Sequence, residues 1–369
     1  GAAATEAAVA LVPGEKPSDA APSTDAVTTM TEVLTGDSVR ASTQEFAAAP
    51  VQVSQGKKDR LSDLEKFGLV ALGALAIGTI IYQNNKANTT TASTSGAPAP
   101  QVVSNTGDRV VVLNPDGTYT VYKDDDAVIR QPGSTVRTET YKDGSTRTII
   151  ERADGSQIVT IRDALGRVLR RAAYDRNGNE MVLIDDLRPE TPVVVSTLPK
   201  PATRPVVIST SDQNAALKAA LAANDVAKLG RSFSLRQIRD IPQVRWLAPT
   251  IDVDPITFDS GSAAIKASQA AELADLGRFM QDLIDQNPRE IFLIEGHTDA
   301  TGLAAMNLAL SDRRAESVAL ALTEYFDIPP ENMVIQGYGE TELLVDTQAN
   351  EPRNRRVGVR IITQLLNGA

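Results

Sequence analysis

The chain has 369 residues, enough for several domains, and its 37 basic and 47 acidic side chains give a net charge of −10. This acidic surplus argues against a nucleic-acid partner, because binding to a phosphate backbone needs a basic surface. The lack of cysteine excludes disulfides, thiolate metal sites and a cysteine nucleophile, and a single histidine leaves few ligands for a zinc site. The sequence therefore predicts neither a metal nor a cofactor.

Residues 1–60 are rich in Ala, Thr, Ser, Glu and Pro and poor in large apolar side chains. A segment of this composition buries too little apolar surface to offset the entropy that folding removes. We therefore expect a disordered tether over residues 1–60.

An uncharged run follows at residues 67–82, in which Gly68, Gly73 and Gly78 recur every five residues. As a helix this run is about 24 Å long, shorter than the roughly 30 Å hydrocarbon core of a bilayer. Recurrent glycines let apolar helices approach each other closely in lipid. The pattern predicts a single apolar membrane helix within residues 61–86, which contacts lipid through its uncharged run. The alternative is a buried core helix.

An internal repeat occupies residues 107–187, after a polar linker over residues 87–106. Six glycines mark it, at intervals of 11 or 12 residues after a first interval of 16: Gly117, Gly133, Gly144, Gly155, Gly166 and Gly178. Most of them follow Asp or Asn, a pairing typical of tight hairpin turns, and β-prone runs lie between them. The predicted strands are residues 109–113, 118–122, 135–141, 145–152, 157–162, 167–174 and 181–184. We expect an all-β repeat domain, a meander or hairpin array, that acts as a spacer or assembly module or binds a protein at a sheet edge.

Residues 188–212 predict a proline-rich linker, and residues 213–249 a helical connector. Beyond residue 250 the apolar pattern alternates between strand and helix periods. The predicted strands there are residues 251–258, 291–295, 333–337 and 355–362, and the predicted helices are residues 263–286 and 303–326. The order β-α-β-α-β-β indicates an α/β domain over residues 250–369, with two helices layered on one sheet.

A polar turn at residues 295–302 connects a buried strand to the helix that follows. A helix start offers free backbone N–H groups and a positive dipole end. Asp299 lies in this turn, and Arg314 shares a face of the helix with Asn307 and Ser311. A carboxylate and a guanidinium in this arrangement suit the ammonium and carboxylate of an amino acid head group. The alternative is a surface salt bridge between Asp299 and Arg314, worth at most about 1 kcal/mol.

The residue motifs of this region are more specific than its charge pattern. The motifs are Gly296-His297-Thr298-Asp299, Gly302, Asn307, Leu310-Ser311, Arg314-Ala315, Val318, Gly337-Tyr338-Gly339-Glu340 and Asn354-Arg355-Arg356-Val357. In order and spacing they resemble the OmpA-like C-terminal domain, over about residues 250–363. The resemblance implies a domain that binds peptidoglycan noncovalently through the diaminopimelate of the stem peptide.

Residue by residue, the resemblance implies that Asp299 contacts the diaminopimelate amine and Arg314 its carboxylate. Thr298, Asn307 and Arg355 match positions that line the same pocket. We therefore expect these five side chains to lie together at one end of the sheet.

Three further features concern the surroundings of that pocket. The turn from Asp259 to Ser262 matches a loop that the family places beside it. Residues 350–353 and Gly358 depart from the family's pattern, and both departures fall on the rim of the last loop. His297 would need an activated nucleophile beside it to act as a general base, and the sequence shows no such signature. We expect His297 to be structural, bonded to a carbonyl or a carboxylate.

These observations favour a binding module rather than an enzyme, because the sequence shows no recognisable signature of paired catalytic acids, a zinc cluster or a cysteine triad. We expect a periplasmic protein, associated with the outer membrane, that tethers a membrane or envelope assembly to the cell wall. Its expected partners are peptidoglycan, membrane lipid and either an outer-membrane protein or a second copy. One alternative is a structural subunit of a porin-type or other envelope complex. Another is a flagellar stator-like subunit, which would need an ionisable residue in the membrane segment, and residues 67–82 contain none.

Overall fold

The computed structural model describes residues 16–46, 101–106, 108–163, 166–187, 190–199, 206–210, 212, 214–252, 256, 258–259, 261–270 and 273–367. The apolar helix predicted within residues 61–86 lies outside these ranges. Of the helices that the described ranges contain, none has the length and apolar character needed to cross a membrane.

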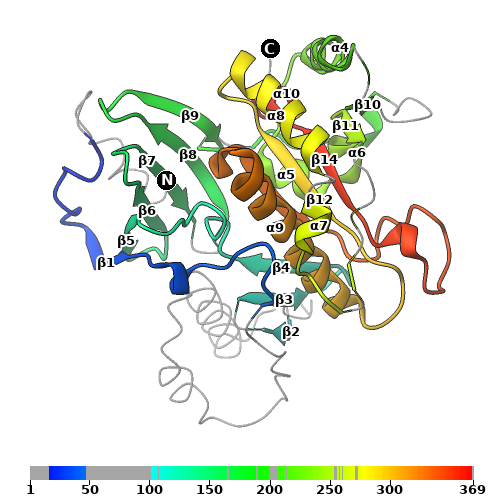
Figure 1. Ribbon diagram of the computed structural model, residues 1–369, viewed down its shortest axis with the longest axis horizontal. Coiled ribbons are helices and arrows are strands. Elements are labelled where there is room, and N and C mark those ends of the chain that lie inside the picture. Colours follow the sequence, from blue (N-terminus) through cyan, green and yellow to red (C-terminus); the bar gives the residue numbers. More distant parts are fainter. Residues whose placement is uncertain are drawn as a thin grey trace, which may run out of the picture.

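Six antiparallel strands form a meander on one side of the molecule (Figure 1). Five of them follow each other in the chain: β5 (Thr135–Tyr141), β6 (Thr146–Glu151), β7 (Gln157–Arg162), β8 (Val168–Tyr174) and β9 (Glu180–Asp185). All six predicted turn glycines have positive φ angles, between 79° and 84°, which other residues rarely adopt. The glycine spacing therefore predicted these strands because each turn needs a left-handed residue.

The sixth strand, β1 (Ala26–Val33), pairs with β5 along its whole length, from Ala26 opposite Tyr141 to Val33 opposite Thr135. The prediction of a disordered tether over residues 1–60 is wrong for this strand. Its run of Thr and Val suits a sheet edge, and it gains stability from a partner more than a hundred residues away in the chain. Composition averaged over a long segment does not reveal such pairing. The short 3-10 turn η1 (Gly36–Ser38) follows it.

A separate three-stranded sheet contains β2 (Gln101–Asn105), β3 (Arg109–Leu113) and β4 (Tyr119–Lys123). The predicted repeat domain thus divides into two sheets, at the place where the glycine interval is 16 instead of 11. The prediction of a linker over residues 87–106 is wrong for β2, which is the first strand of this sheet.

The C-terminal part is built on a five-stranded sheet in the order β10-β11-β14-β12-β13. These strands are β10 (Val207–Ser209), β11 (Thr250–Asp252), β12 (Phe292–Gly296), β13 (Met333–Gly337) and β14 (Val357–Ile361). β12 runs parallel to β13 and antiparallel to β14. The predicted β-α-β-α-β-β order is present, and β10 extends the sheet from within the segment predicted to be a linker.

Helices cover both faces of this sheet. On one face lie α8 (Ala274–Gln286) and α9 (Ala304–Phe326), and the short helix α7 (Ala267–Ala270) precedes α8 in the chain. On the other lie α5 (Leu235–Asp240), α6 (Pro242–Arg245) and α10 (Thr363–Asn367), together with side chains from β9, and α4 (Ala215–Ala227) packs beside α10 and β10. The prediction of two layers was incomplete, because the apolar side chains of β12 point to both faces and both need cover. The remaining 3-10 turns within the described ranges are η2 (Val195–Thr197), η4 (Pro330–Asn332) and η5 (Pro352–Asn354).

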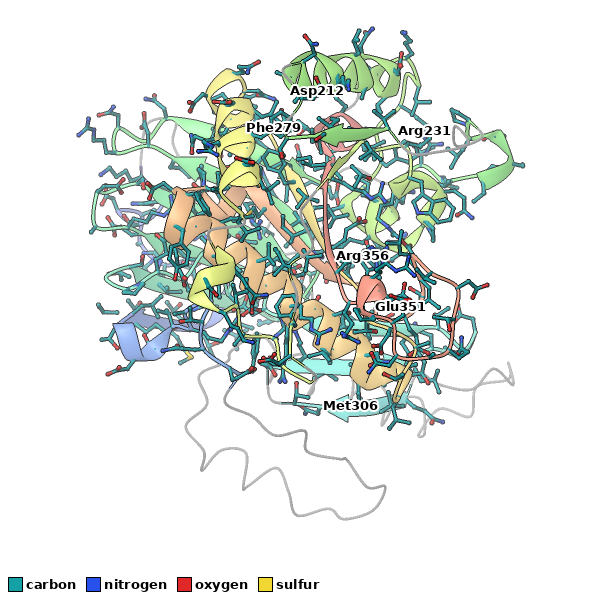
Figure 2. All side chains as sticks on the ribbon, turned by 45° about the vertical axis from the view of Figure 1, so that its right-hand side comes forward. Asp212, Arg231, Phe279, Met306, Glu351 and Arg356 are labelled. Carbon is teal, nitrogen blue, oxygen red and sulfur yellow. The ribbon has the colours of Figure 1, made fainter. Side chains whose placement is uncertain are left out.

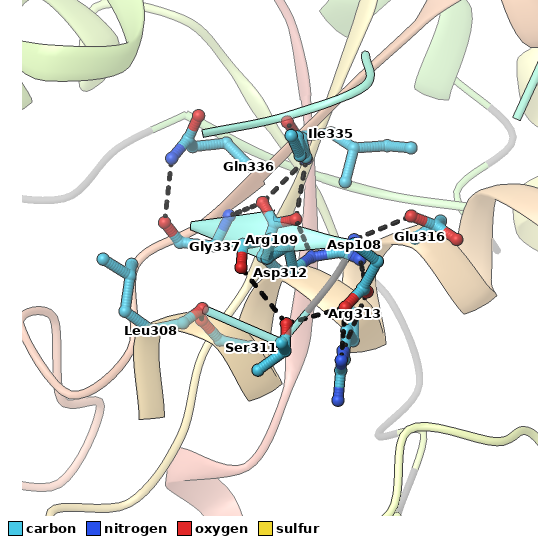
Figure 3. A network of polar contacts seen from close by, with 12 residues as sticks. Asp108, Arg109, Leu308, Ser311, Asp312, Arg313, Glu316, Ile335, Gln336 and Gly337 are labelled. Carbon is cyan, nitrogen blue, oxygen red and sulfur yellow. Dashed lines mark hydrogen bonds and ion pairs between the residues drawn. The ribbon is translucent and has the colours of Figure 1, made fainter. Parts of the chain in front are cut away.

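The three-stranded sheet packs on the outer side of α9, so that this helix is enclosed from both sides (Figure 1). At the centre of the contact is Asp312, which is fully buried. Its carboxylate accepts a hydrogen bond from Arg109 at 2.7 Å, and Arg109 also pairs with Glu316 at 2.7 Å (Figure 3). Lys123 donates to the same carboxylate at 2.7 Å. Asp312 further accepts the backbone N–H of Gly337 at 2.9 Å. These ion pairs join strands β3 and β4 to the helix.

Strand β13 is the last strand of its sheet, yet side chains from elsewhere in the chain occupy its backbone carbonyls. The carbonyl of Ile335 accepts from Lys123 at 2.9 Å and from Arg239 at 3.3 Å, and that of Met333 accepts from Arg171 at 3.3 Å. Exposed edge strands pair readily with other chains, and covering them prevents this. The upstream sheets and the helical connector therefore close the edge of the C-terminal sheet.

Candidate functional site

Two glycines bring α9 against the ends of β12 and β13. A Cβ atom at Gly296 would lie 1.8 Å from the carbonyl oxygen of Ser311, and one at Gly337 would lie 2.5 Å from the backbone nitrogen of Asp312. Both obstacles are helix backbone, which cannot rotate away. Because these positions carry no side chain, α9 crosses the strand ends at close range and its first turns meet the polar turn after β12.

The carboxylate of Asp299 lies in that turn and is held by three donors. Its Oδ1 accepts from the Thr301 backbone N–H at 3.1 Å and from the Thr301 hydroxyl at 2.5 Å, and its Oδ2 accepts from Arg355 at 2.8 Å. Burial would raise the pKa of Asp299, but the hydrogen bonds from Thr301 and Arg355 outweigh it and lower that pKa. The group is therefore an ionised carboxylate in a fixed position.

Asn307 connects this turn to the loop after β13. Its side-chain amide donates to the carbonyl of Thr301 at 3.0 Å and to the carboxylate of Glu340 at 2.6 Å, with a longer contact to the carbonyl of Asp299 at 3.4 Å. Thr298 precedes the carboxylate and is buried, and its hydroxyl oxygen has no hydrogen-bond partner among the described residues. Asn307 thus fixes the shape of the turn.

Arg314 is buried, with 1% of its surface exposed, and its guanidinium lies over the ring of Phe258 at 5.0 Å. Its Nε donates to the carbonyl of Ser262 at 3.0 Å, and its Nη2 donates to the carbonyl of Asp259 at 3.2 Å. The Nη1 atom has no hydrogen-bond partner within the described part of the chain. Among the described residues, the guanidinium therefore contacts two neutral carbonyls and has no direct anionic partner.

The charges around Arg314 explain its pKa. Burial, followed by the positive charge of Arg355, lowers the pKa of Arg314 to about 10, although the carboxylates of Asp299 and Glu45 act in the opposite direction. The guanidinium remains charged at neutral pH. A buried cation in this state is stabilised by any anion that can reach its vacant donor.

The structure therefore brings the five predicted residues to one end of the sheet. Within the described residues, Asp299 pairs with Arg355 and not with Arg314, so the simple Asp299–Arg314 salt bridge is not formed. The result is a carboxylate and a guanidinium that are near each other but separately held. The two charges are complementary to those of a ligand with one ammonium and one carboxylate.

His297 lies beside this site, on the opposite face of the strand end, and is 2% exposed. Its ring stacks on Tyr338 with centroids 5.8 Å apart, and burial followed by the charge of Arg356 lowers its pKa well below the usual range. The imidazole is therefore neutral. Its Nδ1 has no hydrogen-bond partner among the described residues, so the partner expected from the sequence is not seen at this nitrogen.

Three residues near the site were missed by the sequence reasoning: Glu340, Asn350 and Glu45. Glu340 stands in a motif that the sequence already contained, and its bond to Asn307 could have been suspected from that motif. Asn350 contacts Arg355 from the loop before η5, and Glu45 comes from the N-terminal segment. Figure 2 shows the side chains around this end of the sheet, with Glu351 and Arg356 on the segment after β13 and Met306 in the first turn of α9.

Comparison with known proteins assigns this region to a family. Residues 257–356 match the family described as the OmpA family. Residues 257–356 form an OmpA family domain. The match covers the turn after β12, the start of α9 and the loop after β13, which are the elements that carry the site.

Relatives of the OmpA family domain include Outer membrane porin F of Pseudomonas aeruginosa, 32% identical over 108 residues, which cover 29% of this chain and 30% of that protein. Probable lipoprotein YiaD of Escherichia coli is 31% identical over 108 residues, which cover 29% of this chain and 47% of that protein. The chain thus spans less than half the length of these two relatives, one named an outer membrane porin and the other a probable lipoprotein.

Among solved structures, the peptidoglycan-associated lipoprotein from Burkholderia pseudomallei is 23% identical, and the match covers 29% of this chain and 86% of that chain with a TM-score of 0.25. At this TM-score the structural likeness adds nothing to the family assignment, which rests on the sequence match.

Proposed function

We propose that the chain binds peptidoglycan noncovalently through the OmpA family domain. The ammonium of a diaminopimelate side chain meets the carboxylate of Asp299, and the adjacent carboxylate of the same ligand meets the guanidinium of Arg314. Thr298, Asn307 and Arg355 line the site. The observation that carries this proposal is the buried guanidinium of Arg314, whose Nη1 lacks a hydrogen-bond partner among the described residues.

The chemistry favours a carboxylate ligand at Arg314. A guanidinium offers two parallel N–H donors to a planar carboxylate, and such charge-assisted bonds are stronger than neutral ones. Free diaminopimelate ends supply that carboxylate next to an ammonium. Lysine in the same peptide position carries the ammonium alone, so it satisfies only the Asp299 end.

In this proposal the protein is a periplasmic tether, associated with the outer membrane, and not an enzyme. Residues 250–369 bind the cell wall, and the three-stranded sheet is docked on them through the ion pairs of Asp312 with Arg109 and Lys123. The predicted contact of residues 61–86 with lipid would supply the membrane end of the tether.

The test is co-sedimentation of the full chain with purified sacculi that contain diaminopimelate. We expect Asp299→Ala and Arg314→Ala each to weaken binding about 10- to 150-fold, since each removes a hydrogen bond to a charged group. Arg353→Ala is a matched control, because Arg353 is an exposed arginine on the loop before β14 that pairs with Glu351. Sacculi with lysine in place of diaminopimelate are expected to bind poorly. Equal sedimentation of the wild type and both site variants would overturn the assignment.

A further inference from the structure

A second segment of the chain reaches the site, and its role deepens the function proposed above, on which this inference rests. After β1 the chain crosses from the meander toward α9 (Figure 1). Leu34 is still bonded to the meander, through its N–H to Ser134 at 2.9 Å and its carbonyl to Gly133 at 2.8 Å. We call residues 34–46 the strap.

The middle of the strap is fixed to α9 and to the chain before α7. Arg40 donates to the Ser317 hydroxyl at 2.8 Å, and the backbone N–H of Ser42 donates to Glu324 at 2.9 Å. The carbonyl of Ser42 accepts the N–H of Ile265 at 2.9 Å. Ser42 is fully buried, so the strap holds a defined path and is not a loose tail at this point.

Phe46 fixes the end of the strap. Its ring lies under the guanidinium groups of Arg40, Arg313 and Arg109, at 3.8, 4.7 and 5.0 Å from the ring centroid. Cations over the face of an aromatic ring attract it. Glu45, the residue before Phe46, is exposed. Because Phe46 is fixed, Glu45 is held beside the loop that accepts hydrogen bonds from Arg314.

The carboxylate of Glu45 bonds the same loop that receives Arg314. It accepts from the Ser262 hydroxyl and from the Ala263 backbone N–H at 3.4 Å, and the carbonyl of Ser262 accepts from Arg314 at 3.0 Å. Glu45 is also one of the two carboxylates whose charge favours the protonated form of Arg314. A single residue, Ser262, therefore lies between the Glu45 carboxylate and the guanidinium.

The vacant Nη1 of Arg314 is itself buried, so a ligand carboxylate reaches it only if a neighbouring group moves. Phe258, Asp259 and Ser262 belong to the domain that forms the site, whereas Glu45 comes from a distant part of the chain. Two carboxylates at this loop would repel each other. Glu45 and the ligand carboxylate are therefore expected to exclude one another.

We propose that the strap is an internal competitor, in which the Glu45 carboxylate, bonded to the loop beside Arg314, keeps a ligand carboxylate away from the Arg314 end of the site and must withdraw before peptidoglycan binds. A site that is open for only a fraction of the time has its apparent affinity reduced by that fraction. Removing the Glu45 carboxylate would then tighten binding. A supporting role, in which Glu45 orients Ser262 and Ala263 for the ligand, predicts the opposite change.

The experiment measures the dissociation constant of a fluorescent stem peptide with diaminopimelate for the full chain. We expect Glu45→Gln and Glu45→Ala each to bind about threefold to tenfold more tightly than the wild type. Asp37→Asn removes an exposed carboxylate from the same strap, in the turn Gly36–Ser38, and is expected to leave the constant unchanged. Ser42→Ala loosens the strap without changing any charge and is expected to tighten binding as well.

The outcomes separate the two proposals. If Arg314→Ala abolishes binding while both Glu45 variants bind like the wild type or more weakly, the strap is not a competitor and the proposed function stands. If neither the wild type nor the Glu45 variants bind the peptide, the proposed function fails and the competitor fails with it. Tighter binding by Glu45→Gln but not by Asp37→Asn supports the competitor.

Discussion

The ion cluster between the three-stranded sheet and α9 makes a quantitative prediction for Arg109→Ala. Arg109 is 1% exposed and pairs with Asp108, Asp312 and Glu316 at distances of 2.5, 2.7 and 2.7 Å. Removing one partner of a buried ion pair costs about 3–5 kcal/mol, because the remaining charge is left uncompensated. Here the carboxylates keep other cations, for example Lys123 at 2.7 Å from Asp312. We therefore expect a loss near the lower end, about 3 kcal/mol.

The assay is urea unfolding of the full chain, followed by the fluorescence of its single tryptophan, Trp246, which directly follows α6. Arg353→Ala serves as the control, since its ion pair with Glu351 is exposed and contributes roughly 0–1 kcal/mol. The double variant Arg109→Met with Glu316→Gln is expected to recover part of the loss, because it removes the uncompensated charge as well. An Arg109→Ala unfolding curve that coincides with that of Arg353→Ala would refute the stabilising role of the cluster.

Two further predictions concern stability. Gly296→Ala places a Cβ atom 1.8 Å from the Ser311 carbonyl oxygen, so it is expected to destabilise the protein by more than about 3 kcal/mol. Gly36→Ala is the control, because a Cβ atom there has nothing within 4 Å, and it is expected to leave the melting temperature unchanged. Burial raises the pKa of Asp186 from 3.8 to about 6, so its stabilising contribution is present below about pH 4 and is lost as pH rises through 6. Asp186→Asn, which keeps an acceptor for the Leu235 N–H, is expected to stabilise the protein by on the order of 2 kcal/mol at pH 7.5 and by nothing at pH 4.

Each of these predictions has a specific result that would contradict it. Equal melting temperatures for the two alanine variants would show that α9 shifts away from the sheet at little cost. An equal gain for Asp186→Asn at both pH values would show that folding does not raise the pKa of this carboxyl.

The local features of the fold were predictable, because they depend on short-range rules. A left-handed glycine such as Gly144 marks its turn wherever it occurs, and the bounds of β5, β7 and β13 follow from that and from apolar alternation. The long helix α9 was equally clear. The sequence could predict that Asp299 and Arg314 share one site, because they lie on elements that adjoin in the sequence.

The long-range features were not predictable from such rules. Charged residues on β3 and β4 gave no sign of burial in the sequence, because the partner of Arg109 and Lys123 is Asp312, about two hundred positions further along the chain. The same holds for Glu45, which stands in a segment whose composition indicated disorder. In both cases the missing information was a tertiary partner.

The covered edge of β13 has a practical consequence for work on the OmpA family domain. A fragment that begins at residue 250 lacks Lys123, Arg171 and Arg239, and so leaves the carbonyls of Met333 and Ile335 without these donors. An edge strand that is uncovered in this way can pair with strands from other copies of the fragment. A self-associating fragment would pellet with or without sacculi and imitate binding. In this protein the upstream sheets and connector shield the OmpA family domain from such self-association, which is why the full chain is the proper sample.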